Sequence, residues 1–100
     1  MDGLFEHNFK EEAKMIEPKI AVENAAKYYR DVSGDNSQII LEELELSRDK
    51  KKWHITLSHA NPVNQSISVL LGTQSENRLY KAFVVDAISG DVDSMKAKKI

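Results

Sequence analysis

The stretch from Tyr80 to Met95 constrains the fold of this chain more than any other. An apolar run leads to Asp86, a short turn follows, and a second extended run leaves the turn after Gly90. Asp86 can accept hydrogen bonds from backbone amides ahead of it, and Gly90 can adopt the left-handed conformation that a tight turn demands. The stretch therefore predicts an antiparallel β-hairpin at the end of the chain.

Alternation along the first strand of this hairpin assigns its side chains to two faces, because successive side chains of a strand point in opposite directions. Phe83 and Val85 are expected to point into the core. The opposite face carries Tyr80, Ala82 and Val84.

A two-residue period also marks residues 43–47 and 53–58, which predicts two more strands. The polar connector 48–52 is short enough for a hairpin loop. The apolar run 39–41 breaks the alternation and predicts a packed connection or a β-bulge. The pattern places Trp53, Ile55 and Leu57 on the buried face with Leu44 and Leu46, and places His54, Thr56 and Ser58 on the other face.

Two helices are expected before the strands. In the first, Asp2 is the candidate cap and Glu17-Pro18 the end, because a proline disfavours helical geometry in the residue before it. The second is predicted from about Val22 to Val32, and the turn residues 33–36 end it. The apolar stripes are Leu4, Phe5, Phe9, Ala13 and Ile16 in the first helix, and Val22, Ala25, Ala26 and Tyr29 in the second.

The order of elements predicts the α+β class, with one or two N-terminal helices packed on one face of an antiparallel sheet of about four strands. A chain of 100 residues is one domain. We divide it into an N-terminal helical extension, 1–17, and a helix-plus-sheet unit, 18–100. Residues 67–71, inside a stretch rich in turn residues, form either a short extra strand or part of a loop.

Composition excludes several classes of protein. The chain has no cysteine, so it is not a disulfide scaffold, a thiol enzyme or a cysteine-ligated zinc protein. Its formal charge of −2 gives no basic field for nucleic acid or an anionic membrane. The N-terminus lacks the pattern of a signal peptide, and no apolar run approaches the ~20 residues that span a bilayer. We expect a cytoplasmic protein with no membrane contact.

The polar residues form no recognisable catalytic or metal site. His7, His54 and His59 are the only histidines, and we expect them at the surface, with His54 and His59 on opposite faces of a strand rather than converging on zinc. Ser58 is the sequence neighbour of His59, which is a poor arrangement for a nucleophile and its base. We therefore expect no enzyme, no metal and no cofactor.

Charged residues also have simple interpretations. Glu43 and Glu45 would share a strand face that is exposed to water, so nothing in the sequence indicates acid–base catalysis. Glu45 is expected to pair across the strands with the lysine cluster 50–52. The basic run 48–52 precedes Trp53, but a single-strand binder needs several exposed aromatic residues, so we expect a solvated hairpin tip and no nucleic acid.

Residues 85–92 read Val-Asp-Ala-Ile-Ser-Gly-Asp-Val. Together with the helix that carries an Ala-Ala pair and the charged hairpin, they resemble the PepSY domain and small bacterial single-domain proteins of this layout. Ser89 stands where the PepSY pattern usually has threonine. The resemblance covers about residues 20–95 and implies a helix packed on an antiparallel sheet, with a non-enzymatic role such as restraining a peptidase or binding a peptide. Since the sequence shows no peptidase domain or signal peptide, we do not expect inhibition of a secreted protease.

The expected function is that of a small non-enzymatic binding or regulatory domain that contacts a protein or a peptide. The alternative is a structural homodimer or an accessory subunit of a larger assembly. An edge strand offers one route for binding. The uncovered sheet face offers the other, and its candidate partner-binding residues are His54, Thr56, Tyr80, Ala82 and Val84.

Overall fold

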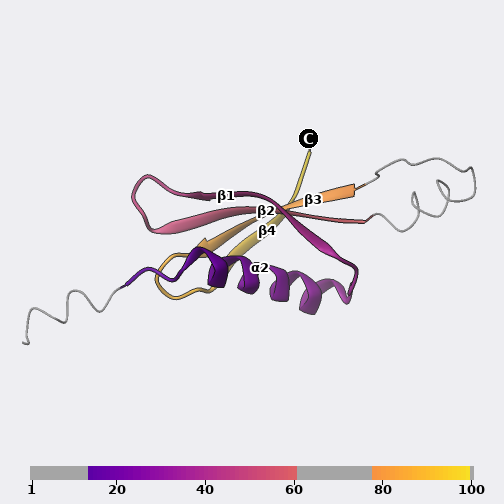
Figure 1. Ribbon diagram of the computed structural model, residues 1–100, viewed down its shortest axis with the longest axis horizontal. Coiled ribbons are helices and arrows are strands. Elements are labelled where there is room, and N and C mark those ends of the chain that lie inside the picture. Colours follow the sequence, from indigo (N-terminus) through magenta and orange to yellow (C-terminus); the bar gives the residue numbers. More distant parts are fainter. Residues whose placement is uncertain (1–13, 61–77, 100) are drawn as a thin grey trace, which may run out of the picture.

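The computed structural model describes residues 14–60 and 78–99. These residues form an antiparallel four-stranded sheet in the spatial order β1-β2-β3-β4, which is also the order along the chain. Within the described residues, one helix lies along one face of the sheet, and no other described element covers the opposite face (Figure 1). This arrangement confirms the predicted α+β fold. The elements are α2 (Pro18–Ser33), β1 (Ile39–Leu46), β2 (Lys52–Ala60), β3 (Arg78–Asp86) and β4 (Val92–Lys98).

Helix α2 begins four residues earlier than predicted. Pro18 occupies its first turn, where a missing backbone N–H costs nothing and the fixed φ angle suits the helix. The predicted end is confirmed, because Gly34 has φ 74° and its N–H donates to the carbonyl oxygen of Arg30 at 2.8 Å. Residues 14–17 are not helical, so a first helix does not reach Glu17 as predicted. The rest of that prediction falls on residues 2–13, outside the described residues.

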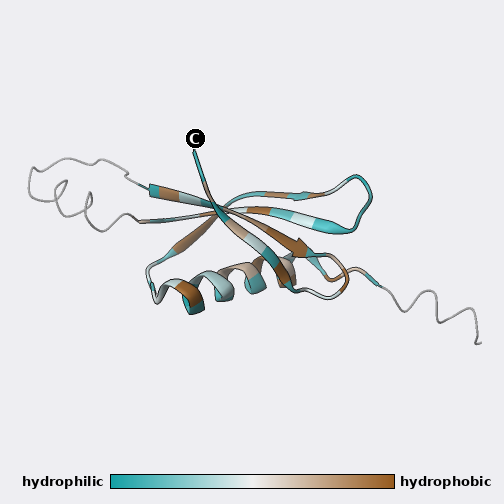
Figure 2. Ribbon diagram, turned by 180° about the vertical axis from the view of Figure 1, so that it is seen from behind, coloured by the Kyte–Doolittle hydropathy of each residue, from teal (hydrophilic) through white to brown (hydrophobic). Residues whose placement is uncertain are grey.

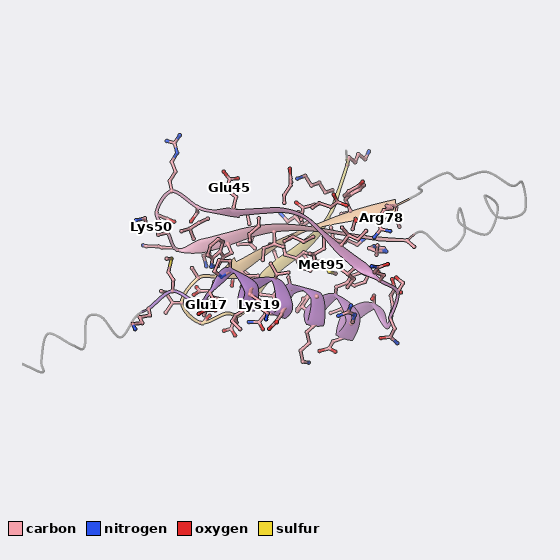
Figure 3. All side chains as sticks on the ribbon, in the orientation of Figure 1. Glu17, Lys19, Glu45, Lys50, Arg78 and Met95 are labelled. Carbon is pink, nitrogen blue, oxygen red and sulfur yellow. The ribbon has the colours of Figure 1, made fainter. Side chains whose placement is uncertain are left out.

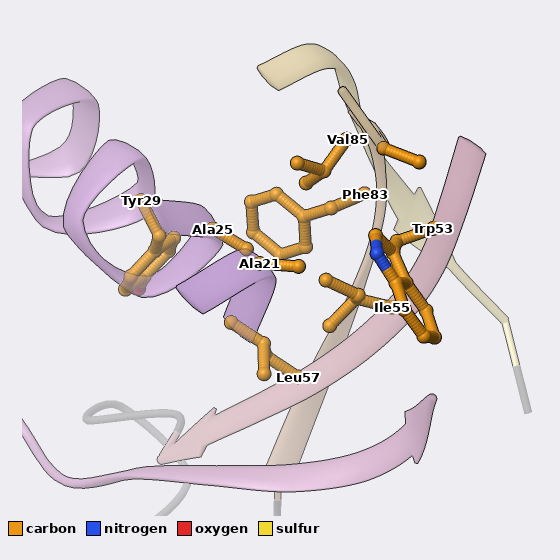
Figure 4. Close-up of a cluster of buried hydrophobic side chains, with 9 residues drawn as sticks. Ala21, Ala25, Tyr29, Trp53, Ile55, Leu57, Phe83 and Val85 are labelled. Atoms are coloured by element: carbon orange, nitrogen blue, oxygen red, sulfur yellow. The ribbon is translucent and has the colours of Figure 1, made fainter. Parts of the chain in front are cut away.

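The core lies between α2 and the middle strands (Figure 4). Ala21 and Ala25 are fully buried, and their small side chains let the helix lie close to the sheet. Phe83, Ile55 and Val85 are the large side chains that this approach covers. Burial of each contributes about 1.5–3 kcal/mol. The predicted burial of Phe83, Val85, Trp53, Ile55 and Leu57 is confirmed.

Each edge strand of the sheet contains one bulged residue. In β1 the pairing passes from Leu41 to Glu43 while β2 advances by a single residue, so Glu42 is the extra residue. In β4 the extra residue is Asp93. Both carboxylates accept hydrogen bonds from β2, Glu42 from Ser58 at 2.7 Å and Asp93 from Lys52 at 2.5 Å. The break in alternation near residues 39–41 is therefore a bulge, one of its two predicted explanations.

The turn between β3 and β4 has the predicted geometry. Asp86 accepts hydrogen bonds from the backbone N–H groups of Ile88 and Ser89, each at 2.8 Å. Gly90 has φ 83°. The same turn holds the segment before α2, because the N–H of Ile16 donates to the carbonyl oxygen of Ala87 at 2.7 Å.

The turn between β1 and β2 is hydrophilic, as expected for a solvated hairpin tip (Figure 2). No helix in residues 14–60 and 78–99 is long and apolar enough to cross a membrane. Residues 67–71, which are predicted to form either a short strand or part of a loop, lie outside the described residues.

Candidate functional site

The five residues predicted to form a partner-binding face lie on the side of the sheet opposite α2. His54 is paired with Val84, and Thr56 with Ala82. Residues paired directly across antiparallel strands project from the same face. The sequence neighbours of His54, Thr56 and Val84 point the other way, into the core beneath α2. We call this side the open face, and its central residues are His54, Thr56 and Ser58 of β2 with Tyr80, Ala82 and Val84 of β3.

The open face contains a hollow of about 850 Å³. Ala82 and Val84 of β3 contribute apolar side chains to its lining. Glu43 and Glu45 of β1 lie along one side, and Figure 3 shows Glu45 pointing away from α2. Lys98 of β4 contributes to the lining from the other side. The hollow thus combines an apolar centre with charges of opposite sign at its two margins.

An ion pair crosses the open face above β2 and β3. Lys98 Nζ donates to the carboxylate of Glu43 and, at 3.2 Å, to the hydroxyl of Thr56. The Thr56 hydroxyl in turn donates to Glu43 Oε1 at 2.9 Å. The hydrogen bond from Lys98, followed by that from Thr56, lowers the pKa of Glu43 from its ordinary value. Thr56 is only 5% exposed, so it supports the ion pair and offers a partner little surface.

Ser58 is the other polar residue in the middle of the open face, and it is fully buried. Its hydroxyl donates to Glu42 Oε2 at 2.7 Å and accepts from Arg78 Nε at 2.8 Å. Arg78 Nη2 also donates to the backbone oxygen of Ser58 at 3.0 Å. The hydroxyl is therefore occupied in linking β1, β2 and β3, and its geometry gives no indication of a nucleophile.

His59 faces α2, on the opposite side from His54 as predicted, but its expected surface location is wrong. It is 7% exposed, and its ring centroid lies 4.6 Å from that of Tyr29. The reason is that β2 continues to Ala60, so the alternation carries His59 under the helix.

Asp35 joins this contact at the end of α2. It accepts a hydrogen bond from the Tyr29 hydroxyl at 2.6 Å and lies 3.6 Å from His59 Nδ1. That hydroxyl bond is the main reason why the pKa of Asp35 is lowered to about 2. His59 Nε2 is buried and has no hydrogen-bond partner among the described residues. The hydrogen bond of Asp35 and the ring contact of Tyr29 with His59 join the end of α2 to β2.

The predicted pairing of Glu45 with the lysine cluster 50–52 is wrong. Glu45 lies opposite His54, because the β1–β2 register places Leu46 opposite Trp53 and the lysines fall in or beyond the turn. Lys52 instead contacts Asp86 at 3.3 Å and Asp93 at 2.5 Å. Within the described ranges 14–60 and 78–99, no group of three His, Cys, Asp or Glu side chains could hold a metal ion. His7 lies outside those ranges.

The pair of Glu43 and Lys98 was not predicted as part of the site. Its members are 55 residues apart, and Lys98 lies beyond Met95, where the predicted hairpin ends. The signal was present in the alternation after Met95, which places Lys96 and Lys98 on the face opposite Met95. Extending the predicted second strand of the hairpin from Met95 to Lys98 would have placed both lysines on the open face.

A comparison with models of known protein families, with curated proteins and with solved structures finds no match to this chain. The resemblance to PepSY domains stays a prediction that depends on residues 85–92 and the order of elements.

Proposed function

We propose that the chain is a small non-enzymatic binding domain of PepSY-like fold that acts in the cytoplasm through contact with a protein or a peptide. The observation that carries this proposal is the open face. Its apolar centre, Ala82 and Val84, lies in a hollow between the carboxylates of β1 and the lysines of β4.

The composition of this face supports contact with a partner. A sheet face that meets water commonly carries polar side chains at its outward positions. Here Ala82 and Val84 occupy the centre and are half-buried, while Ile40 on β1 is 39% exposed. A hollow of about 850 Å³ is large enough to take several side chains. Since Glu43 and Lys98 already pair with each other, a fitting peptide has apolar side chains in its middle, a basic residue near Glu45 and an acidic residue near Lys96.

The face is a better candidate than the edges of the sheet. Strand addition needs a flat edge with an uninterrupted row of N–H and C=O groups. Both edge strands are interrupted, β1 by Glu42 and β4 by Asp93. A peptide that pairs with either edge would lose register at the bulge, so we assign binding to the open face rather than to an edge strand.

Selection from a random peptide library displayed on phage, with the folded chain as bait, tests this proposal. Val84→Lys puts a charge into the apolar centre, and Tyr28→Lys is the matched control, because Tyr28 is 38% exposed on α2. Enriched peptides should lose about tenfold or more in affinity for Val84→Lys, since a buried unpaired charge is costly, and should keep their affinity for Tyr28→Lys. Circular dichroism checks that both variants fold. Peptides that bind both variants equally, or no enrichment at all, would contradict the proposal.

A homodimer through the same face is the second candidate, and the separation of charge favours it. A two-fold axis parallel to the strands would place β1 of one copy over β4 of its partner. Glu45 of each copy would then lie two residues along the strand from Lys96 of the other, about 7 Å, which a lysine side chain can reach. Both side chains are exposed. An axis perpendicular to the strands would instead bring like charges together.

Sedimentation over a range of concentrations tests the homodimer. Glu45→Lys should weaken association, and Lys96→Glu in the same chain should restore it, because the pair is exchanged symmetrically. A strict monomer at the highest concentration would exclude this candidate and leave the heterologous partner.

A further inference from the structure

A row of apolar side chains on edge strand β1 is left partly uncovered on the helix side of the sheet. Register pairs Leu41 with Leu57, Leu44 with Ile55 and Leu46 with Trp53. Since these β2 residues are core residues facing α2, the three leucines project from the same side. Leu41 is nevertheless 44% exposed and Leu44 37% exposed. We call Leu41, Leu44 and Leu46 the β1 row.

The described chain begins at one end of this row. The N–H of Ile16 donates to Ala87 O, and the N–H of Ala87 donates to Lys51 O at 2.8 Å. Lys51 directly precedes β2, whose residue Trp53 is opposite Leu46. Figure 1 shows the start of the described chain at the same end of the sheet as the β1–β2 hairpin. Residues 1–13 therefore connect to the fold at the same end of the sheet as Leu46, where Ile16 is bound to the β3–β4 turn.

The sequence of this segment suits the row. Leu4, Phe5, Phe9 and Ala13 recur at helical spacing and alternate with charged residues. Thirteen helical residues span about 20 Å at ~1.5 Å per residue. The row from Leu41 to Leu46 spans about 17 Å at ~3.3 Å per residue. The two lengths match, and the glutamates of β1 project from the other face of the sheet.

We propose that residues 1–13 dock on the β1 row as an amphipathic helix, with Phe9 against Leu44 and Phe5 against Leu41. This contact covers the helix side of the sheet beyond α2. It is independent of partner binding on the open face, because it uses the opposite side of β1. The buried indole Nε1–H of Trp53, which has no acceptor among the described residues, lies opposite Leu46, at the end of the row where the described chain begins.

A double-mutant cycle in the full chain tests the docking. Phe9→Ala and Leu44→Ala should each lower the equilibrium constant for folding in a urea titration. In the double variant, the fold-decrease in this constant should be smaller than the product of the two single fold-decreases by a factor of at least about three, because residues in contact couple. The control is Phe9→Ala with Leu79→Ala. Leu79 is 41% exposed and lies opposite His59, at the far end of the sheet from the Leu46 end of the row, so these effects should multiply.

Effects that multiply in both pairs would overturn the proposal. Coupling that grows with protein concentration, together with dimers in sedimentation, would also overturn it, because the row would then hold a segment of a second copy. Hydrogen exchange of the unsubstituted chain gives a measurement that needs no variant. Amides of residues 4–13 should exchange at least about tenfold more slowly than in an unstructured peptide, and exchange at the unstructured rate would refute docking.

Discussion

Substitution of Gly90 by alanine offers a sharp test of how the β3–β4 turn is joined to α2. Gly90 has φ 83°, and a methyl group there would lie 2.9 Å from Asn24 Nδ2. That same nitrogen donates to the carbonyl oxygen of Gly90 at 2.9 Å, so the methyl group would displace the hydrogen bond. The left-handed backbone costs alanine about 1–2 kcal/mol, and loss of the hydrogen bond adds about 1 kcal/mol. We expect Gly90→Ala to reduce the free energy of unfolding by about 2–3 kcal/mol.

Gly34 provides the matched control. Its φ of 74° is nearly the same, but an added methyl group would have no atom within 4 Å. Gly34→Ala should therefore lose only the backbone contribution, about 1–2 kcal/mol. Urea unfolding followed by the fluorescence of Trp53, the only tryptophan, measures both losses.

A third variant separates the two contributions at Gly90. In an Asn24→Ala background the hydrogen bond and the close contact are both absent, so Gly90→Ala should cost no more than Gly34→Ala. Equal losses for the two glycines in the unsubstituted chain would refute the reasoning. So would a cost at Gly90 that is unchanged by removal of the Asn24 amide.

Three other changes have definite expected outcomes. Trp53→Ala should cost ~3–5 kcal/mol in the same urea assay, and a near-neutral result would show that the indole is not part of the core. Hydrogen bonds from the N–H groups of Ser89 and Ile88 lower the pKa of Asp86 from 3.8 to about 2, so its carboxylate stabilises the fold above pH 4 and this contribution is lost as the pH falls through 2. Asp86→Asn should remove that part of the acid sensitivity in pH-dependent unfolding. Lys98→Met should change stability by only ~0–1 kcal/mol, because the pair is exposed, yet raise the pKa of Glu43 toward its ordinary value in an NMR titration; an unchanged pKa would contradict the ion pair.

The strands and their faces could be predicted from the sequence because a period of two depends only on local geometry. Trp53 and Phe83 were correctly placed in the core for this reason. Pro18 was misinterpreted because one residue has two local meanings, the end of one helix or the start of the next. The burial of His59 depends on the length of β2, which composition does not mark.

The candidate site was harder to predict, because it depends on side chains that meet across several strands. His54, Ala82 and Val84 could be assigned to one face by alternation alone. The ion pair of Glu43 with Lys98 spans three strand pairings, and each must be in register before the two side chains can meet. Sequence periodicity indicates which side a residue faces, and it does not give the register between strands.

The order of the strands has a consequence for how fast the chain folds. Each strand pairs with its neighbour in sequence, so the sheet can form one hairpin at a time, at a low cost in loop closure. Contacts of α2 with the β3–β4 turn join residues that are much farther apart in the sequence, such as Asn24 and Gly90, which are 66 residues apart. We expect the helix to dock after the rate-limiting step. Asn24→Ala should then accelerate unfolding and leave the refolding rate nearly unchanged in stopped-flow measurements.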